Sequence, residues 1–479
     1  MKKITVLICT HLLIIGWITA QPAGVHFSSP DTALQNAFDL AKQMALHYRA
    51  QPGDAVGPWY ESALPPRYAF CMRDVSHQCI GAEILGMHPE NINMFSKFVS
   101  NISASKDWCT FWEMDKYNRP APADYKSDTE FWYNLNANFD LTDACWRTYL
   151  WTGDTMFLRD PAFLNFYSRS YNEYIDRWIL QADSLLTRPG YPNAPRPFDS
   201  TNAFHRCRGL PSYSEGVHNL KMGIDLVAAI YRGMLSYASF LKANNQSGKA
   251  DLLVKKASAY RKSIDAFWWD EKESLYNTHY TNDRQFGKGE GETFLLWFDA
   301  LRDSTRERKT IEHLLGMDLN VENQSYLPLQ LYRHGYWQKA RDRMIYLASP
   351  STERREYPEV SFGIVEAFVQ GLMGVEADAL SRTVSSIYRS NNATGAELQD
   401  LPVLNTLINI GHSGKNSSHV LNKGKYAFTW KAMFYGSFST AVINNKKVPL
   451  KKEKDSSGNP VSFITTRVAP RQHVTITAL

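Results

Sequence analysis

The stretch Ser212-Tyr-Ser-Glu215-Gly-Val-His218-Asn219 runs into a long apolar segment, Lys221-Met-Gly-Ile-Asp-Leu-Val-Ala-Ala-Ile-Tyr-Arg-Gly-Met-Leu-Ser-Tyr-Ala-Ser-Phe-Leu241. A carboxylate, Glu215, is therefore predicted on a loop at the head of a helix, expected over 216–244, that is apolar enough to need burial. Catalytic groups are often held on loops that a rigid scaffold positions. The alternative is that Glu215 caps the helix, since acidic side chains are favoured in a first turn.

Helical periodicity extends outward from this segment through most of the chain. Apolar residues recur at spacings of three and four, and short connections alternate with long loops, a pattern typical of repeated antiparallel helix pairs. The spacing of the pairs predicts a mainly α fold, an (α/α)6 toroid of six helix hairpins over 21–390, although no repeat is visible at the sequence level. The expected helices cover 33–48, 74–86, 91–102, 138–152, 161–183, 216–244, 247–268, 290–301, 305–315, 328–334, 336–348, 361–372 and 377–388.

The pattern changes near residue 391. Segments that start at Thr406, Tyr426, Ser437, Val461 and His473 alternate apolar and polar residues with a period of two, between turns rich in Asn, Gly and Lys. The sequence therefore predicts a small all-β module over 391–479 that packs on the helical body.

The composition limits the class of partner. With 44% hydrophobic and 21% charged residues over 479 positions, the chain can bury a large core. A net charge of +5 is small for this length, and no basic run is interleaved with aromatics, so a nucleic-acid partner is not expected. Aromatic residues make up 13% of the chain, and aromatic faces suit the apolar faces of sugars, although most such residues serve as core.

The N-terminus has the pattern of a secretory signal peptide over residues 1–20. Lys2 and Lys3 precede the apolar stretch Ile4–Trp17, and Ala20 provides a small residue before the cleavage point. No second apolar run of that kind follows, so we expect an exported protein, periplasmic or secreted, without stable membrane insertion.

Cysteine usage predicts neither a disulfide framework nor a zinc site. Five scattered cysteines remain after the expected cleavage, and neither a CxxC pair nor an HExxH motif occurs. No metal or other cofactor is expected. The five cysteines are Cys71, Cys79, Cys109, Cys145 and Cys207.

Four stretches resemble the six-hairpin glycosidases, a group that includes glycogen-debranching amylo-1,6-glucosidases, processing α-glucosidases and α-L-rhamnosidases. Tyr68-Ala-Phe-Cys-Met-Arg73-Asp74 is similar to the segment that lines their sugar pocket, and Leu141–Asp154 ends in a Thr-Gly-Asp found in several of these families. Glu215 with the helix behind it resembles the segment of their general acid, and Arg355-Glu-Tyr-Pro-Glu359 that of their general base. The acid of the debranching branch is usually Asp, whereas this chain has Glu.

The resemblance implies inverting hydrolysis of a glycosidic bond. In that reaction a protonated carboxyl donates to the leaving oxygen, and an ionised carboxylate about 6.5–9.5 Å away activates water. Glu215 is assigned as the general acid, with a pKa expected to be raised by desolvation. Glu359 is assigned as the general base, with Glu356 as its nearest substitute. The alternative for Glu359 is again a helix-start acid.

Further candidates for sugar binding follow from the same resemblance. Arg73 and Asp74 form a charged pair that can bind two neighbouring hydroxyls, although a structural ion pair is the alternative. Trp112 is a candidate stacking platform or a core residue. The remaining candidates are Glu113, Asp143 and His205, and a single His is more often structural.

Three other functions remain open from the sequence. A polysaccharide lyase or unsaturated-uronide hydrolase on the same toroid would use Arg206, His205, Asn219 and Tyr213. A non-catalytic glycan-binding protein would keep the aromatic residues and need no carboxylate pair. An isomerase or epimerase is the third, and the signal peptide argues against it. The expected partner is an oligosaccharide or polysaccharide attacked from its end, because long loops on one side favour a closed pocket. The sugar, its linkage and the oligomeric state are not specified by the sequence.

Overall fold

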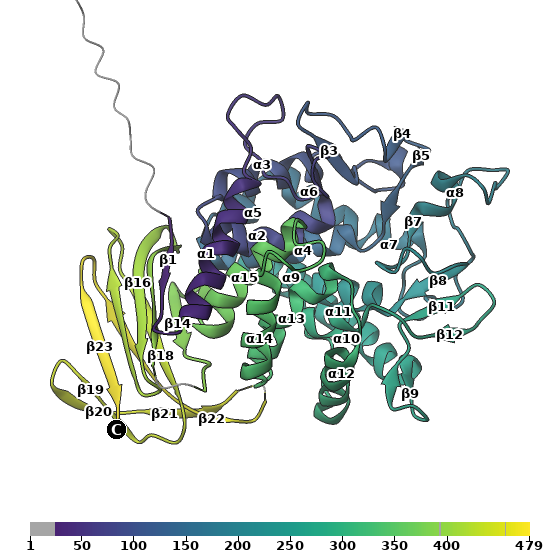
Figure 1. Cartoon of the computed structure of the whole chain (residues 1–479). Helices are drawn as coiled ribbons and strands as arrows, with labels where there is room; N and C mark the ends of the chain where they lie inside the picture. The colour runs from purple at the N-terminus through teal and green to yellow at the C-terminus, as the bar shows by residue number, and fades with distance from the viewer. Residues whose placement is uncertain (1–23, 392–393, 456) are drawn as a thin grey trace, which may run out of the picture.

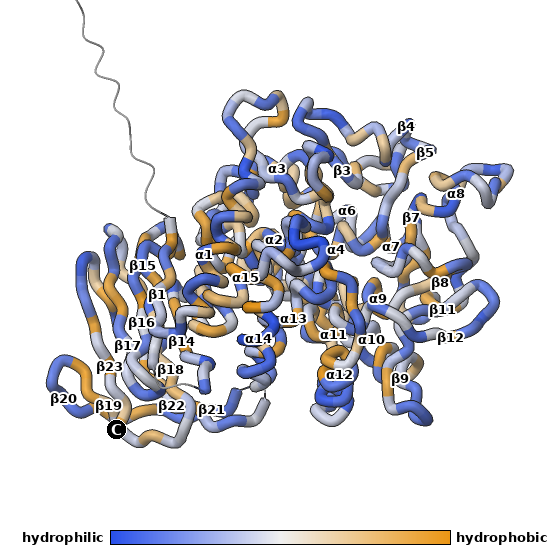
Figure 2. The backbone as a smooth tube through the Cα atoms, viewed as in Figure 1, coloured by the Kyte–Doolittle hydropathy of each residue, from blue (hydrophilic) through white to orange (hydrophobic). Residues whose placement is uncertain are grey.

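The computed structural model describes residues 24–391, 394–455 and 457–479, so the predicted signal peptide lies outside the described residues. A mainly helical body is joined to a C-terminal region of strands, and the strands lie on the side of the body where the first helix runs (Figure 1). Hydrophobic segments gather where the helices pack on one another, and hydrophilic ones follow the outer loops (Figure 2).

The body contains helices of very different length. Two of them continue into a π-helical turn, at Ile264–Trp268 and Ala367–Leu372. The helices are α1 Thr32–His47, α2 Met72–Ile84, α3 His88–Val99, α4 Ala137–Thr152, α5 Met156–Arg159, α6 Pro161–Tyr171, α7 Glu173–Trp178, α8 Ala203–Cys207, α9 Ile224–Ala243, α10 Ser247–Ser263, α11 Glu292–Trp297, α12 Ser304–Gly316, α13 Val321–Arg333, α14 Trp337–Ala348 and α15 Pro358–Glu366.

Six of these helices form a closed circuit of neighbours. α2 packs on α4, α4 on α9, α9 on α11, α11 on α13, α13 on α15, and α15 on α2. Helix α9 is long and apolar enough to cross a membrane, but 78% of its apolar window is buried inside the protein. Its hydrophobic surface is therefore used by the helices packed around it, as a central core helix requires.

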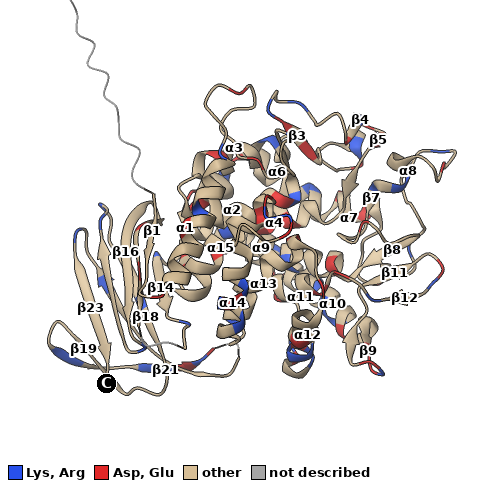
Figure 3. Cartoon of the chain, in the orientation of Figure 1, with Lys and Arg blue, Asp and Glu red and all other residues tan. Residues whose placement is uncertain are grey.

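The strand-rich region consists mainly of two sheets. Their strand orders are β1-β15-β16-β17-β23-β19-β20 and β13-β14-β18-β22-β21. The strands are β1 His26–Ser28, β13 Glu376–Asp378, β14 Thr383–Ile387, β15 Ala396–Val403, β16 Thr406–Ser413, β17 Ser417–Asn422, β18 Phe428–Tyr435, β19 Thr440–Ile443, β20 Lys446–Pro449, β21 Lys451–Lys454, β22 Pro460–Val468 and β23 His473–Ala478. Lys446 and Lys447 begin β20, which lies at the edge of its sheet. Acidic and basic residues are interspersed along the body (Figure 3).

The N-terminal strand ties the sheets to the helices. β1 pairs antiparallel with β15, and its central residue, Phe27, contacts Phe38 of α1 and Phe368 with ring centroids 5.4 and 4.9 Å apart. The chain thus enters through the strand-rich region before it forms the helical body.

The helix expected over 377–388 is wrong. This segment forms β13 and β14, and β14 pairs in parallel with β18. Val384 and Ser386 are buried at alternate positions, as expected for a strand that packs one face on the core. These two strands precede residue 391, and the predicted domain boundary there stays a prediction.

Two helices, α9 and α13, begin far from the expected residue, and both differences matter for the site. The helix expected from 216 starts at Ile224, because Leu220–Gly223 forms strand β8. Its first-turn acid is Asp225, so the alternative in which Glu215 caps this helix is wrong. The helix expected from 328 starts at Val321, because the Asn320 side chain accepts a hydrogen bond from the Asn323 N–H at 2.8 Å.

Close packing between circuit helices predicts a stability effect. A Cβ on Gly81 of α2 would stand 2.4 Å from the carbonyl oxygen of Phe362 in α15, so Gly81→Ala is expected to destabilise the protein by about 1–3 kcal/mol. Gly248→Ala in α10 is the matched control: its Cβ would meet nothing within 4 Å, and it is expected to stabilise by about 0.5–1 kcal/mol. Denaturant unfolding measures both, and equal stability of the two variants would contradict the prediction.

Candidate functional site

Six acidic side chains line a cavity of about 610 Å³. Three circuit helices present their first turns to it: α2 with Arg73 and Asp74, α13 with Glu322, and α15 with Glu359. The loop that carries Glu215 forms another part of the wall. The charged and aromatic lining residues are Arg67, Arg73, Asp74, Trp112, Asp124, Trp132, Tyr213, Glu215, Glu290, Glu322, Arg354, Tyr357 and Glu359.

Arg73 connects the two sides of the cavity. Its Nη1 lies 3.4 Å from Glu215 Oε1, its Nη2 lies 3.1 Å from Glu322 Oε1, and its Nε lies 3.3 Å from Asp74 Oδ1. The guanidinium also lies 5.0 Å from the ring centroid of Tyr213, where a cation–π contact adds to its fixation. The predicted Arg73–Asp74 pair is therefore present, within a larger ion-pair network.

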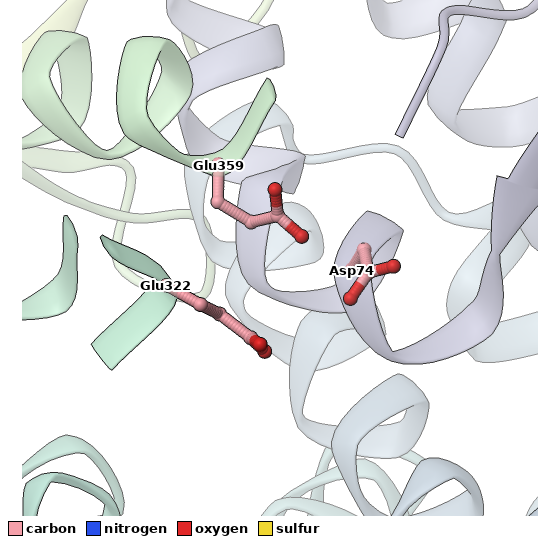
Figure 4. Close-up of side chains that lie close together, drawn as sticks. All are labelled: Asp74, Glu322 and Glu359. Carbon is pink, nitrogen blue, oxygen red and sulfur yellow. The ribbon is translucent and has the colours of Figure 1, made fainter. Parts of the chain in front are cut away.

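Asp74, Glu322 and Glu359 form a carboxylate cluster (Figure 4). One carboxylate oxygen from each lies within 4.8 Å of the others. Glu359 is only 2% exposed, and its Oε2 has no hydrogen-bond partner in the described part of the chain. Oxygens placed in this way are ligands that Mg²⁺ and Ca²⁺ prefer. Here, however, the Arg73 cation already pairs with two of the three carboxylates.

The cluster cannot be fully ionised. Burial raises the pKa of Glu359 well above its usual value, and the negative charges of Asp74 and Glu322 raise it further. Burial also raises the pKa of Glu322 to about 7, although Arg73 opposes this shift. Like charges at this separation disfavour one another. The cluster therefore holds a proton near neutral pH, with Glu359 as its most deeply buried member.

Buried aspartates hold the Glu215 loop in place. Asp225 accepts hydrogen bonds from Ser212 Oγ at 2.8 Å and from the Tyr213 N–H at 2.6 Å. The Tyr213 hydroxyl donates to Asp140 Oδ2 at 2.5 Å. Both aspartates are buried, so the loop is attached to α9 and α4 just before the residue that carries the carboxylate.

Glu215 itself reaches the mouth of the cavity. Its side chain is 46% exposed, and the cavity walls around it displace enough water to raise the pKa of its carboxyl, an effect that Arg73 opposes. A raised pKa at an accessible carboxyl is the property expected of a proton donor.

One further predicted residue lines the cavity, and another pairs with a lining residue. Trp112 lines it, with its ring centroid 4.4 Å from that of Trp132. Glu113 is buried and does not line the cavity, but it pairs with the lining residue Arg67, which also pairs with Asp124. Burial raises the pKa of Glu113 to about 9, helped by the nearby Asp124.

Three predicted residues are not brought to the cavity. Asp143 is buried between Arg147 at 3.2 Å and Arg232 at 3.0 Å; burial favours a higher pKa, but the two guanidiniums bring the pKa of Asp143 below its usual value. His205 in α8 accepts a hydrogen bond from the Asp199 N–H at 3.0 Å. Glu356 is exposed on the loop before α15. None of the three lines the cavity, and Asp143 and His205 serve local structure.

Sequence reasoning missed Glu322 and Glu290. The sequence pattern predicts a helix that begins at Pro328 and so leaves Glu322 in a loop. In the structure, Asn320 caps a helix that has Glu322 in its first turn. The Asn320-Val-Glu-Asn323 run was the available signal. Glu290 accepts from the Asn320 N–H at 3.0 Å, and its carbonyl accepts from Ser214 Oγ at 2.9 Å. Glu290 thereby links the Glu215 loop to α13.

Comparison with known proteins finds likeness in structure. No family model matches the chain, and no curated protein matches it in sequence. A GH78 rhamnosidase of Bacillus sp. GL1 superposes with a TM-score of 0.57 at 13% identity over 82% of this chain. An α-L-rhamnosidase from Dictyoglumus thermophilum does so with a TM-score of 0.58 at 11% identity over 95%. A protein described as a kojibiose phosphorylase from the human microbiome gives 0.54 at 9% identity over 94% of this chain and 68% of its own.

These likenesses show the fold. The chain has the six-hairpin glycosidase type of fold, as the resemblance of the four sequence stretches predicts. It spans 40% and 50% of the length of the two rhamnosidases. At identities this low, the comparison leaves the activity to be argued from the cavity.

Proposed function

We propose that this chain is an exported glycoside hydrolase that removes a terminal sugar from an oligosaccharide or polysaccharide with inversion. The proposal rests chiefly on one observation: Arg73 joins Glu215 at the cavity mouth to the buried carboxylate cluster through different nitrogens of one guanidinium. A guanidinium that lies between two carboxylates keeps their oxygens further apart than they would be if the carboxylates touched. An inverting enzyme needs such a gap for a water molecule.

The proposed architecture is the complete (α/α)6 toroid. In it, α2, α4, α9, α11, α13 and α15 form the inner ring, and the closed circuit of contacts among them supports this assignment. Acids in the first turns of α2, α13 and α15 then meet at one end of the ring. Residues far apart in the sequence are brought together in this way.

Each carboxylate has a distinct task in the proposed mechanism. Glu215 donates its proton to the leaving oxygen, and its raised pKa keeps that proton available. Glu359 accepts the proton of the attacking water. It does so as a member of the cluster, after the cluster has lost the proton that burial places on Glu359. Arg73 and the Trp112 ring bind and orient the sugar.

The shape of the cavity supports removal of a terminal sugar. About 610 Å³ is in the range of a small-molecule site. Of its lining carboxylates, Glu359 is buried and Glu215 is about half exposed. A sugar held between them has its scissile bond at the mouth.

A panel of aryl glycosides tests the proposal. We expect hydrolysis of one member, and proton NMR of the first product should show the anomer opposite to the substrate. Retention of configuration would overturn the inverting mechanism. Turnover of none of the glycosides or glycans, with measurable oligosaccharide binding, would support a glycan-binding protein. Cleavage of a uronide with a new ultraviolet absorbance would indicate elimination.

Glu322→Gln tests the role of the cluster through pH. The base can act only after the cluster loses a proton, so the rate is expected to rise with pH as Glu359 ionises, a step that burial and the charges of Asp74 and Glu322 shift to higher pH by raising the pKa of Glu359. The variant removes a negative charge beside Glu359 and lowers the pKa of that carboxyl. The acidic limb of the kcat profile is then expected to move to lower pH by about one unit. An unmoved limb, or one at higher pH, would show that Glu322 does not interact with the base.

A further inference from the structure

A second, smaller cavity lies on the other side of the Glu215 loop. Its volume is about 70 Å³, and Glu215 and Val217 line both this cavity and the larger one. The remaining wall comes from the segments around 188–192, 206–211 and 218–221. A single water needs only about 10–15 Å³ of such space. The cavity therefore accommodates a small polyatomic group, but it is far smaller than the cavity proposed to take a sugar.

A buried arginine without a carboxylate partner is one of the residues that line this cavity. Arg188 is 2% exposed, and its Nη1 donates to the Lys221 carbonyl at 3.3 Å. Its Nε and Nη2 have no hydrogen-bond partner among the described residues, and no carboxylate in the described ranges forms an ion pair with it. Burial lowers the pKa of Arg188 to about 10, so it is still charged at neutral pH.

Arg208 provides the internal comparison. It is buried to a similar degree, 4% exposed, but its Nη1 lies 2.6 Å from Asp107 Oδ2. A buried charge without a partner is strongly unfavourable. Arg188 therefore lacks the compensating carboxylate that Arg208 has, although both guanidiniums are buried.

The other groups that face this cavity are mostly basic. Arg206, Lys221 and His218 line it together with Arg188. Burial, together with Arg284 and Arg188, lowers the pKa of Lys221. The one carboxylate in the wall is Glu215, whose Oε1 lies 3.4 Å from Arg73 in the larger cavity. The nearby Asp283 accepts a hydrogen bond from Asn219 at 2.7 Å.

We propose that this cavity binds an oxyanion group, a sulfate or carboxylate, through Arg188 and Lys221. Because Glu215, the proposed donor to the leaving oxygen, lines this cavity as well, we place that group on the leaving side of the bond to be cleaved, so the natural substrate carries an anionic substituent there. The proposal of an anion site depends only on the cavity and on Arg188. The proposal that the anion belongs to the substrate rests on the proposed function. A guanidinium suits such a group because it donates two parallel hydrogen bonds.

Free sulfate tests the site itself. Isothermal titration of the full chain with sodium sulfate, against sodium chloride at equal ionic strength, is expected to show specific binding. Lys221→Gln, at a partly exposed position, should weaken it about tenfold, and Arg188→Met should abolish it. Lys255→Gln, an exposed position on α10 away from the cavity, should leave it unchanged. Circular dichroism checks that each variant folds, and Lys221→Gln keeps the test decisive if Arg188→Met does not.

Matched substrates then test the assignment. For one sugar that the enzyme hydrolyses, kcat/KM is compared between a neutral aglycone and the same aglycone with a sulfonate or carboxylate. A higher value for the anionic aglycone, lost in Lys221→Gln, supports the proposal. Sulfate binding without such a gain overturns the assignment to the substrate and leaves a site for a free ion. Absence of binding by either kind of anion overturns the site, whereas sulfate binding with no hydrolysis of any glycoside overturns only the proposed hydrolase function.

Discussion

Replacing Glu215 by Gln is expected to lower kcat by about 10²–10⁴-fold on substrates with a sugar leaving group. Glutamine keeps the size of the side chain but has no proton to give to the leaving oxygen. The loss should shrink strongly for a dinitrophenyl glycoside, because that leaving group departs without protonation. Steady-state kinetics on the two substrates measures this difference, and KM should change little.

The thermal stability of the fold provides the control for this variant. The Glu215 side chain is 46% exposed and meets Arg73 only at 3.4 Å, so its ion pair contributes about 0–1 kcal/mol and the midpoint of thermal unfolding should barely move. An equal loss on both leaving groups would remove Glu215 from the role of acid. The acid would then be sought among the other carboxylates of the cavity wall, such as Asp124 or Glu290.

Replacing Glu359 by Gln is expected to lower kcat by about 10²–10⁴-fold on every substrate. Water must be activated whatever the leaving group, so the dinitrophenyl glycoside should lose as much as the natural linkage. This uniform loss distinguishes the base from the acid. The same assays measure it, together with the pH profile, whose acidic limb should disappear if the base was the group that titrated.

Glu356→Gln is the matched control, three residues earlier. Glu356 is exposed and does not line the cavity, and its backbone carbonyl accepts a hydrogen bond from the Tyr48 hydroxyl at 2.6 Å, which the substitution leaves in place. Its kcat should stay within about twofold of the unmodified chain, since surface substitutions away from such features have small effects. If Glu359→Gln kept full activity while Glu322→Gln lost it, the base would be Glu322.

Local patterns were sufficient for most of the helical body. The apolar spacing predicts the core helix over 137–152, and the end of the helix over 224–243, within one residue, because a buried helix must repeat its apolar face every three to four positions. The period-two segments after residue 405 likewise predict β16, β18 and β23. The helix predicted over 377–388 is wrong because this segment forms strands. Its strand β14 is stabilised by pairing with β18, some fifty residues later, which no local pattern records.

The sequence by itself determined a helical chain with a strand-rich end and a loop carboxylate ahead of a core helix, since these depend on residue order over a few turns. The tertiary structure alone decided which acids meet. It placed Glu322 beside Glu359 and Asp74, took Asp143 into a buried ion pair, and left Arg188 unpaired behind Glu215. Helix packing sets these separations between residues distant along the chain, and electrostatic interactions depend on that distance and on burial rather than on sequence order.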